Sequence, residues 1–202
     1  LRPEHERQVG ARLRQAGLYV ALSSEILPEF REYERASTTV ASAYVAPVLD
    51  RYLSRLEEAL GGLRFRVMQS NGGLIRTEEV RTQAVRCALS GPAGGLIGAR
   101  YVAGLGGVHN LITFDMGGTS TDVALIAGEL PLTTGGSIDG LPIGVPMLDI
   151  HTVGAGGGSI AAVDPGGALR VGPRSAGADP GPACYGKGGE AATVTEIGRA
   201  HV

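Results

Sequence analysis

Hydrophobic residues recur at helical spacing in two stretches near the start of the chain. Val9, Leu13 and Ala16 predict a helix over 4–16 that ends at Gly17. A longer helix is predicted over 40–60, because a hydrophobic residue stands at every fourth position: Val40, Tyr44, Val48, Tyr52, Leu56 and Leu60. Between the two helices, the loosely alternating stretch 18–23 predicts a strand.

The chain changes character after residue 60. Residues 65–68 predict a short strand that runs into the turn 69–73, and Ser90 begins a predicted helix rich in Ala and Gly. A loop follows at 104–110, where we place a domain boundary. Beyond it, hydrophobic runs predict a β-meander of three strands over 111–115, 122–126 and 130–133. This mixture predicts an α/β fold.

Charge and composition argue against several functions. The 202 residues carry 18 Lys and Arg against 20 Asp and Glu, so the net charge of -2 offers no general basic surface for a nucleic acid. No hydrophobic run approaches the roughly 20 residues of a membrane helix. Cys87 and Cys184 are isolated from each other and from any metal-ligand pattern, which fits a reducing compartment. We therefore expect a cytoplasmic protein without nucleic-acid or membrane partners.

The stretch Phe-Asp-Met-Gly-Gly-Thr-Ser-Thr-Asp-Val-Ala-Leu at 114–125 places a polar turn between two predicted strands. Glycines let backbone N–H groups approach an anion closely, and hydroxyl groups add donors, so the turn can hold phosphate oxygens. Asp115, at the end of the first strand, could hold a hydrated Mg²⁺ beside a phosphate. The candidate residues are Asp115, Gly117, Gly118, Thr119, Ser120, Thr121 and Asp122. The same residues also suit an ordinary hairpin turn, and the motif alone leaves both interpretations open.

A second glycine-rich run covers 154–159. Here an anion site, a loop that another segment approaches closely, and simple loop flexibility all fit the composition of Gly156, Gly157, Gly158 and Ser159. Just before it, Asp149 and His151 would point to one face of a strand, as two metal ligands can. Because no third ligand is evident, we favour a structural pair, in which Asp149 bonds a loop and His151 is satisfied in the core.

Residues 115–122, Asp-Met-Gly-Gly-Thr-Ser-Thr-Asp, resemble the second phosphate motif of the hydantoinase A and 5-oxoprolinase family. Further stretches are similar to the same family in the same order, among them Met-Gln-Ser-Asn-Gly-Gly, Leu-Ser-Gly-Pro-Ala-Gly-Gly and Asp-Ile-His-Thr-Val-Gly-Ala-Gly-Gly-Gly-Ser-Ile-Ala. The resemblance implies an actin-like ATPase fold of the ribonuclease H-like kind, with two lobes joined by a connecting helix. It places 1–108 at the end of the first lobe with that helix, and 109–202 at the start of the second lobe with the phosphate-binding hairpin.

Family members also carry a first Asp-x-Gly-Gly-Thr motif near their N-terminus, which is not present here. The resemblance therefore implies an internal segment with half an active site, inactive alone. In such a segment we expect the hydrophobic stripe of the 40–60 helix to be exposed and liable to associate.

By resemblance, the parent protein is an ATP-dependent hydrolase that phosphorylates the amide of a cyclic substrate before water opens the ring. ATP and Mg²⁺ are the implied cofactors: Asp115 would act through a Mg²⁺-bound water, the rest of the turn would cradle phosphates, and Asp122 would brace the turn. The implied partner is a B-type hydantoinase subunit or domain. Two alternatives stay open, an ATP-dependent ketone carboxylase subunit of the same superfamily and a catalytically silent segment that binds a partner subunit.

Residues 196–202 depart from the family pattern. Their back-translation resembles a common sequencing adapter, and they show neither a helical nor a strand period. We predict that this tail is an artefact without selected structure or function, and that His201 is not a ligand.

Overall fold

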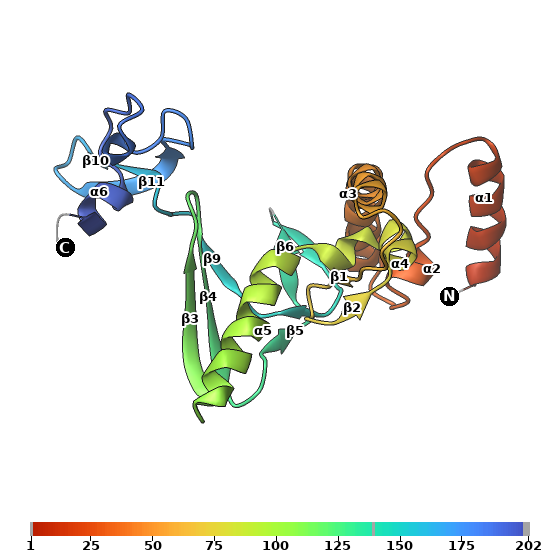
Figure 1. The fold of residues 1–202 in the computed structure, drawn as a ribbon. Helices are drawn as coiled ribbons and strands as arrows, with labels where there is room; N and C mark the ends of the chain where they lie inside the picture. Colours follow the sequence, from red (N-terminus) through yellow and green to blue (C-terminus); the bar gives the residue numbers. More distant parts are fainter. Residues whose placement is uncertain (1, 139, 200–202) are drawn as a thin grey trace. The chain divides into compact units, whose positions relative to one another are not determined.

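The computed structural model describes residues 2–138 and 140–199. It is an α/β structure (Figure 1). The chain divides into two compact units, Leu1–Gly98 with Leu130–Asp149, and Ala99–Glu129 with Ile150–Val202. This division differs from the boundary predicted near residue 108, because residues 130–149 belong to the first unit. No helix in the described part of the chain is long and apolar enough to cross a membrane.

The first unit combines helices with short two-stranded sheets. Its helices are α1 (Pro3–Gln15), α2 (Ser23–Ile26), α3 (Glu32–Ala59), α4 (Thr77–Thr82) and the 3-10 helix η1 (Ala84–Cys87), and α5 (Ser90–Leu105) continues into the second unit. Its strands pair antiparallel as β1 (Val67–Met68) with β2 (Leu74–Ile75), β5 (Leu132–Thr133) with β8 (Met147–Leu148), and β6 (Gly136–Ile138) with β7 (Leu141–Ile143). The predicted turn at 69–73 is confirmed as the β1–β2 connection.

The start of the chain confirms one predicted element and corrects another. Helix α1 forms as predicted, and Gly17 follows it with a φ of +79°. The strand predicted over 18–23 is wrong, because residues 18–22 form no strand and α2 begins at Ser23. The carboxylate of Glu6 accepts the backbone N–H groups of Ser23 (2.6 Å) and Ser24 (2.9 Å). A side chain thus satisfies N–H groups at the start of α2, which have no partner within the helix.

The core of the first unit joins segments that are far apart in the sequence. Its buried residues are Ile26, Leu27, Val85, Ile143, Val145 and Met147. Gly144 lies against this core, since its N–H donates to the Thr38 hydroxyl of α3 (3.0 Å) and an added Cβ would come within 2.5 Å of Leu27. Burial against α2 and α3 explains why residues 130–149 belong to this unit.

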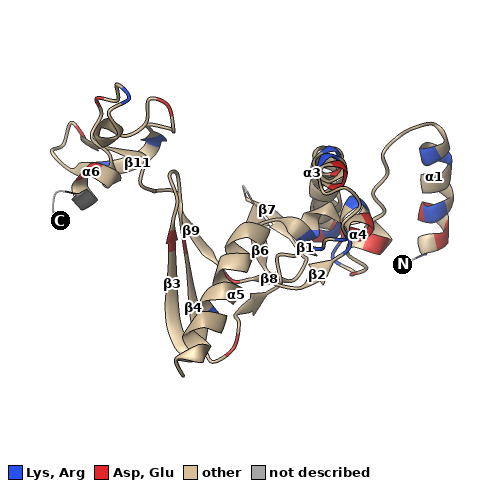
Figure 2. Cartoon of the chain, viewed as in Figure 1, with Lys and Arg blue, Asp and Glu red and all other residues tan. Residues whose placement is uncertain are grey.

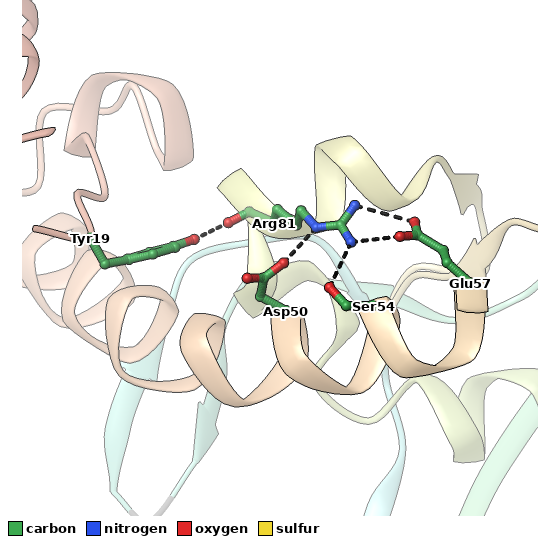
Figure 3. A network of polar contacts seen from close by, with 5 residues as sticks. All are labelled: Tyr19, Asp50, Ser54, Glu57 and Arg81. Carbon is green, nitrogen blue, oxygen red and sulfur yellow. Dashed lines mark hydrogen bonds and ion pairs between the residues drawn. The ribbon is translucent and has the colours of Figure 1, made fainter. Parts of the chain in front are cut away.

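Arg81 ties α4 to α3 (Figure 3). Its guanidinium donates to Asp50 (2.5 Å), to Ser54 (3.3 Å) and to both carboxylate oxygens of Glu57 (2.8 and 3.2 Å). The hydrogen bonds with Glu57 raise the pKa of Arg81 and lower the pKa of Glu57. The Tyr19 hydroxyl donates to the Arg81 carbonyl. Charged side chains are concentrated on α1, α3 and α4 (Figure 2), so this ion-pair network lies in the most charged part of the unit.

The hydrophobic stripe of α3 faces solvent in this chain, as expected from the resemblance. Val40, Tyr44, Val48 and Tyr52 are each at least 60% exposed. The buried positions of the helix are Thr38, Ser42, Ala46 and Leu53. Helical spacing therefore predicted the helix correctly but not which of its faces is buried here.

The second unit contains a three-stranded sheet and a two-stranded sheet. Strands β3 (Asn110–Met116) and β4 (Thr121–Ala127) form an antiparallel hairpin, and β9 (His151–Val153) pairs with the other edge of β4. The remaining elements are β10 (Ser159–Val163), β11 (Leu169–Ser175), the 3-10 helix η2 (Ala183–Tyr185) and α6 (Val194–Arg199). The hairpin confirms two predicted strands. A strand forms within the predicted 130–133, as β5, but its predicted place in the meander is wrong, because β5 pairs with β8 and β9 lies beside β4.

The last described segment also differs from expectation. Residues 194–199 form α6, so the prediction of an unstructured tail is wrong for residues 196–199. The Glu196 carboxylate accepts hydrogen bonds from the N–H of Cys184 (2.9 Å) and from the N–H and hydroxyl of Thr193 (both 2.6 Å). His201 lies outside the described residues, and the artefactual origin of the tail stays a prediction.

Candidate functional site

The predicted phosphate turn is the four-residue connection of the β3–β4 hairpin. Strand register pairs Met116 with Thr121, which leaves Gly117 to Ser120 as the turn. The N–H of Gly117 donates to the carbonyl of Ser120 (2.9 Å) and closes it. Gly117, Gly118 and Thr119 are exposed and Ser120 is half-buried, so the tip of the hairpin is open to a ligand in this chain.

Two carboxylates lie next to this turn. Asp115 of β3 is the register partner of Asp122 of β4, and Asp122 is in turn opposite Thr152 of β9. Residues paired in this way point to the same face of a sheet. The Thr152 hydroxyl donates to Asp122 (2.6 Å), whereas Asp115 is exposed and its carboxylate has no hydrogen-bond partner within 2–138 and 140–199. Like charges directly opposite each other destabilise a strand pair, so the arrangement suits a bound cation.

The second glycine run lies directly against the turn. The N–H of Gly157 donates to the carbonyl of Gly117 (2.8 Å), and the N–H of Gly158 donates to the carbonyl of Gly118 (2.7 Å). The two glycine-rich segments singled out separately in the sequence are therefore hydrogen-bonded to each other.

Gly156 stands at the closest approach between the two segments. An added Cβ would come within 2.6 Å of the Gly117 carbonyl oxygen and within 2.7 Å of the backbone nitrogens of Thr119 and Ser120. The N–H of Gly156 donates to the Ser159 hydroxyl (2.9 Å). Of the three interpretations of this run, the contacts favour a close-approach loop, because the N–H groups of residues 156–159 are all donated within the protein.

The turn itself retains donors for a ligand. The N–H groups of Gly118, Thr119 and Ser120 have no hydrogen-bond partner among the described residues, and neither do the hydroxyls of Thr119 and Ser120. Thr121 differs, since its hydroxyl is buried and donates to the carbonyl of Ala155 (2.6 Å). The unpartnered donors of the turn therefore lie in residues 118–120, and Thr121 fastens the turn to the neighbouring loop.

Asp149 and His151 do not form the predicted structural pair. His151 begins β9, Asp149 precedes that strand, and both residues are exposed. The expectation that His151 is satisfied in the core is therefore wrong. No group of three or more His, Cys, Asp and Glu side chains in the described ranges is placed to hold a metal ion. A cation beside Asp115 would need ligands from water or from a phosphate, as is usual for Mg²⁺.

Sequence reasoning did not identify Thr195, which contacts the site from α6. Its hydroxyl (2.7 Å) and its N–H (3.0 Å) both donate to the Gly157 carbonyl. Thr193 to Glu196 spell Thr-x-x-Glu, the sequence pattern of a helix N-terminal capping box. That signal could have predicted the start of α6, although not its contact with Gly157.

The first unit has a hollow of about 600 Å³ between the end of α3 and the start of α4. It is lined by Glu57, Gly62, Leu63, Arg64, Phe65, Arg66, Arg76, Thr77 and Glu78. The lining mixes both charges, and Glu57 is already paired with Arg81. None of the residues with predicted chemistry lies in it, so the hairpin turn is the better candidate site.

A family model described as Hydantoinase/oxoprolinase matches residues 35–198, which include both glycine-rich segments and Thr195. The chain belongs to the hydantoinase/oxoprolinase family. This family member is 46% identical over 201 residues to the caprolactamase subunit alpha of Pseudomonas jessenii, covering 96% of this chain and 29% of the relative. It is 44% identical over 202 residues to the 5-oxoprolinase of Saccharomyces cerevisiae, covering 96% of this chain and 15% of the relative.

Two solved structures resemble this hydantoinase/oxoprolinase chain closely. The crystal structure of the ATP-dependent caprolactamase from Pseudomonas jessenii matches with a TM-score of 0.77 and 44% identity, covering 98% of this chain and 30% of that chain. A nucleotide-free structure of acetone carboxylase, described under ATP-dependent acetone carboxylation, matches with a TM-score of 0.76 and 34% identity, covering 95% and 28%. The chain thus spans less than a third of each of these proteins.

Proposed function

We propose that the protein containing this chain is an ATP-dependent hydrolase of cyclic amides, and that the β3–β4 turn binds the phosphates of Mg-ATP. One observation carries the proposal. At the tip of one hairpin, the unpartnered N–H groups of residues 118–120 lie next to the opposed carboxylates of Asp115 and Asp122. Anion donors beside a pair of carboxylates suit a phosphate with its metal ion better than either ion alone.

The family supports the substrate class. The names caprolactamase and 5-oxoprolinase both denote cleavage of a ring amide, and the caprolactamase of known structure is described as ATP-dependent. An unstrained ring amide resists water. Bound ATP would supply the phosphoryl group that turns the amide oxygen into a leaving group before water opens the ring. We propose an actin-like ATPase fold for the whole protein, in which this chain supplies the end of one lobe, the connecting helix and the start of the next lobe.

Each residue of the site has a role in this proposal. Asp115 would hold Mg²⁺ through a bound water, and residues 118–120 would donate to phosphate oxygens. Asp122, which accepts the hydrogen bond of Thr152, would brace the turn. Gly117 and Thr121 would close the turn, and Gly156, Gly157, Gly158 and Ser159 would support it from behind.

A second candidate is ATP-dependent carboxylation of a ketone, supported by the similarity to acetone carboxylase. The two reactions share activation of a carbonyl oxygen, so the phosphate turn would serve both. Phosphate release that depends on a lactam favours hydrolysis, and release that depends on a ketone with bicarbonate favours carboxylation.

The relatives named as subunits support a partner, for which we propose a B-type subunit or domain. Because the chain spans so little of its relatives, residues 1–202 alone would be inactive, and a silent role in binding that partner is the remaining alternative.

Replacement of Asp115 tests the proposed function. In the full-length protein, Asp115→Ala should abolish ATP turnover while the far-UV circular dichroism spectrum and the melting temperature stay near wild type, because the side chain is exposed and unpartnered. Asp149→Ala is the matched control, since Asp149 is also an exposed carboxylate but lies outside the turn. ATP turnover at the wild-type rate in Asp115→Ala would contradict the proposed role of the turn in Mg-ATP binding.

A further inference from the structure

We infer that Thr195, in the first turn of α6, is a positioning residue that aims the N–H groups of the phosphate turn. The inference rests on the proposed function, because the turn is the proposed phosphate site. Thr195 does not itself reach the turn; it acts through the glycine run, by holding the carbonyl of Gly157.

The link from α6 to the turn consists of hydrogen bonds in series. Thr195 donates its hydroxyl (2.7 Å) and its N–H (3.0 Å) to the Gly157 carbonyl. Gly157 and Gly158 then donate their N–H groups to the carbonyls of Gly117 (2.8 Å) and Gly118 (2.7 Å). The glycine run is therefore held on one side by α6 and holds the turn on its other side.

The geometry of the peptide bond converts this contact into an orientation. The carbonyl of Gly117 shares a planar trans peptide with the N–H of Gly118, and the carbonyl of Gly118 shares one with the N–H of Thr119. In a trans peptide the N–H points opposite to the C=O. Because both carbonyls point at the glycine run, the N–H groups of Gly118 and Thr119 point away from it, toward the side on which a ligand can bind.

The first turn of α6 is itself held in place. Glu196 accepts hydrogen bonds from the N–H and hydroxyl of Thr193 (both 2.6 Å) and from the N–H of Cys184 (2.9 Å). Bonding by Cys184 and Thr193 lowers the pKa of Glu196 to about 2, so this carboxylate stays charged at neutral pH. The segment that carries Thr195 is thus held by contacts other than the one with Gly157.

The test compares Thr195→Val with Thr195→Ser in the full-length protein. Thr113→Val is the matched control, because the Thr113 hydroxyl is also hydrogen-bonded to a backbone, that of Ala124. Thr113 lies in β3, away from the glycine run. The first readout is hydrogen exchange at the N–H groups of Gly157 and Gly158. Exchange should rise about three- to tenfold in Thr195→Val, the effect of about one lost hydrogen bond, and stay at the wild-type rate in Thr195→Ser and Thr113→Val.

The second readout is the dissociation constant for Mg-ATP. It should rise by a similar factor in Thr195→Val and return to the wild-type value in Thr195→Ser. Faster exchange with unchanged Mg-ATP affinity would overturn the positioning role alone. Wild-type protein that binds no Mg-ATP would overturn the proposed function, and the role of Thr195 with it. Unchanged exchange would overturn the structural link. Thr195→Ala replaces the Val variant if that variant does not fold.

Discussion

At Gly156 the backbone of the turn leaves no space for a side chain. A Cβ there would lie 2.6–2.7 Å from three backbone atoms, none of which can move aside without displacing the turn. Gly154, two positions earlier, has nothing within 4 Å of its Cβ position. Within one short run, a glycine is therefore required at position 156, whereas position 154 has space for a side chain.

Gly156→Ala should therefore lower the free energy of unfolding by about 1–3 kcal/mol, the usual cost of overpacking, and should weaken Mg-ATP binding. Gly154→Ala is the control and should change both quantities little. Urea unfolding followed by circular dichroism and a Mg-ATP titration measure them. Equal effects of the two substitutions would show that the close approach at Gly156 does not exist.

Glu196 should make the stability of the folded protein depend on pH in the acidic range. Its folded pKa of about 2 lies below the unfolded value of about 4.3, so its contribution to stability is full above the unfolded value and is lost as the pH falls toward 2. The melting temperature of Glu196→Gln should therefore be lower than wild type at pH 6, and the difference should shrink as the pH falls from about 4.5 toward 2. Glu190→Gln, at an exposed carboxylate without a hydrogen-bond partner in the described structure, should show no such convergence.

At the residue scale, the sequence predicted a candidate phosphate turn, whose chemistry stays a prediction, but not the contacts that support the turn. The glycines, hydroxyls and carboxylates of 115–122 are residue types that indicate anion and metal binding. The contact between Gly117 and Gly157 spans forty residues and depends on the pairing of β9 with β4, which no local pattern encodes. Thr195 carries no distinctive chemistry, so only its contact with Gly157 identifies it.

At the element scale, predictions succeeded where local pattern decides and failed where a distant partner decides. The β3–β4 hairpin joins strands that are adjacent in the chain, and α1 is followed by Gly17, a residue type that stops helices. In contrast, residues 18–22 form no strand and lead into α2, whose first N–H groups bond the Glu6 carboxylate, and β5 pairs with β8 instead of continuing the meander. The spacing of α3 predicted its existence, but which face is buried depends on the segments that pack against it.

The α3–α4 contact should depend on Arg81. Arg81→Ala should lower the free energy of unfolding by about 1–2 kcal/mol, because it removes charge-assisted hydrogen bonds to Asp50 and Glu57 that are partly shielded from water. Arg55→Ala is the control, since Arg55 is an exposed arginine of α3 without an ion-pair partner among the described residues. Chemical denaturation of the two variants measures the difference, and equal midpoints would contradict a stabilising role for the network.

At the scale of the whole molecule, the chain corresponds to a part of its longer relatives. It spans 15–30% of the relatives and structures compared above, and its α3 stripe is exposed in this chain. The α/β class followed from the alternation of helical and strand patterns, whereas the division into two units followed from burial of 141–148 against α2 and α3. What the turn binds is therefore a question for the full-length protein.

The most direct measurement is a crystal structure of the full-length protein with Mg²⁺ and a non-hydrolysable ATP analogue. The account predicts phosphate oxygens within hydrogen-bond distance of the N–H groups of Gly118, Thr119 and Ser120, with the metal ion linked to Asp115 through a water molecule. It also predicts that the N–H groups of Gly157 and Gly158 keep their bonds to Gly117 and Gly118. A nucleotide bound elsewhere, with the turn free of phosphate and Asp115 away from the metal, would contradict the central claim.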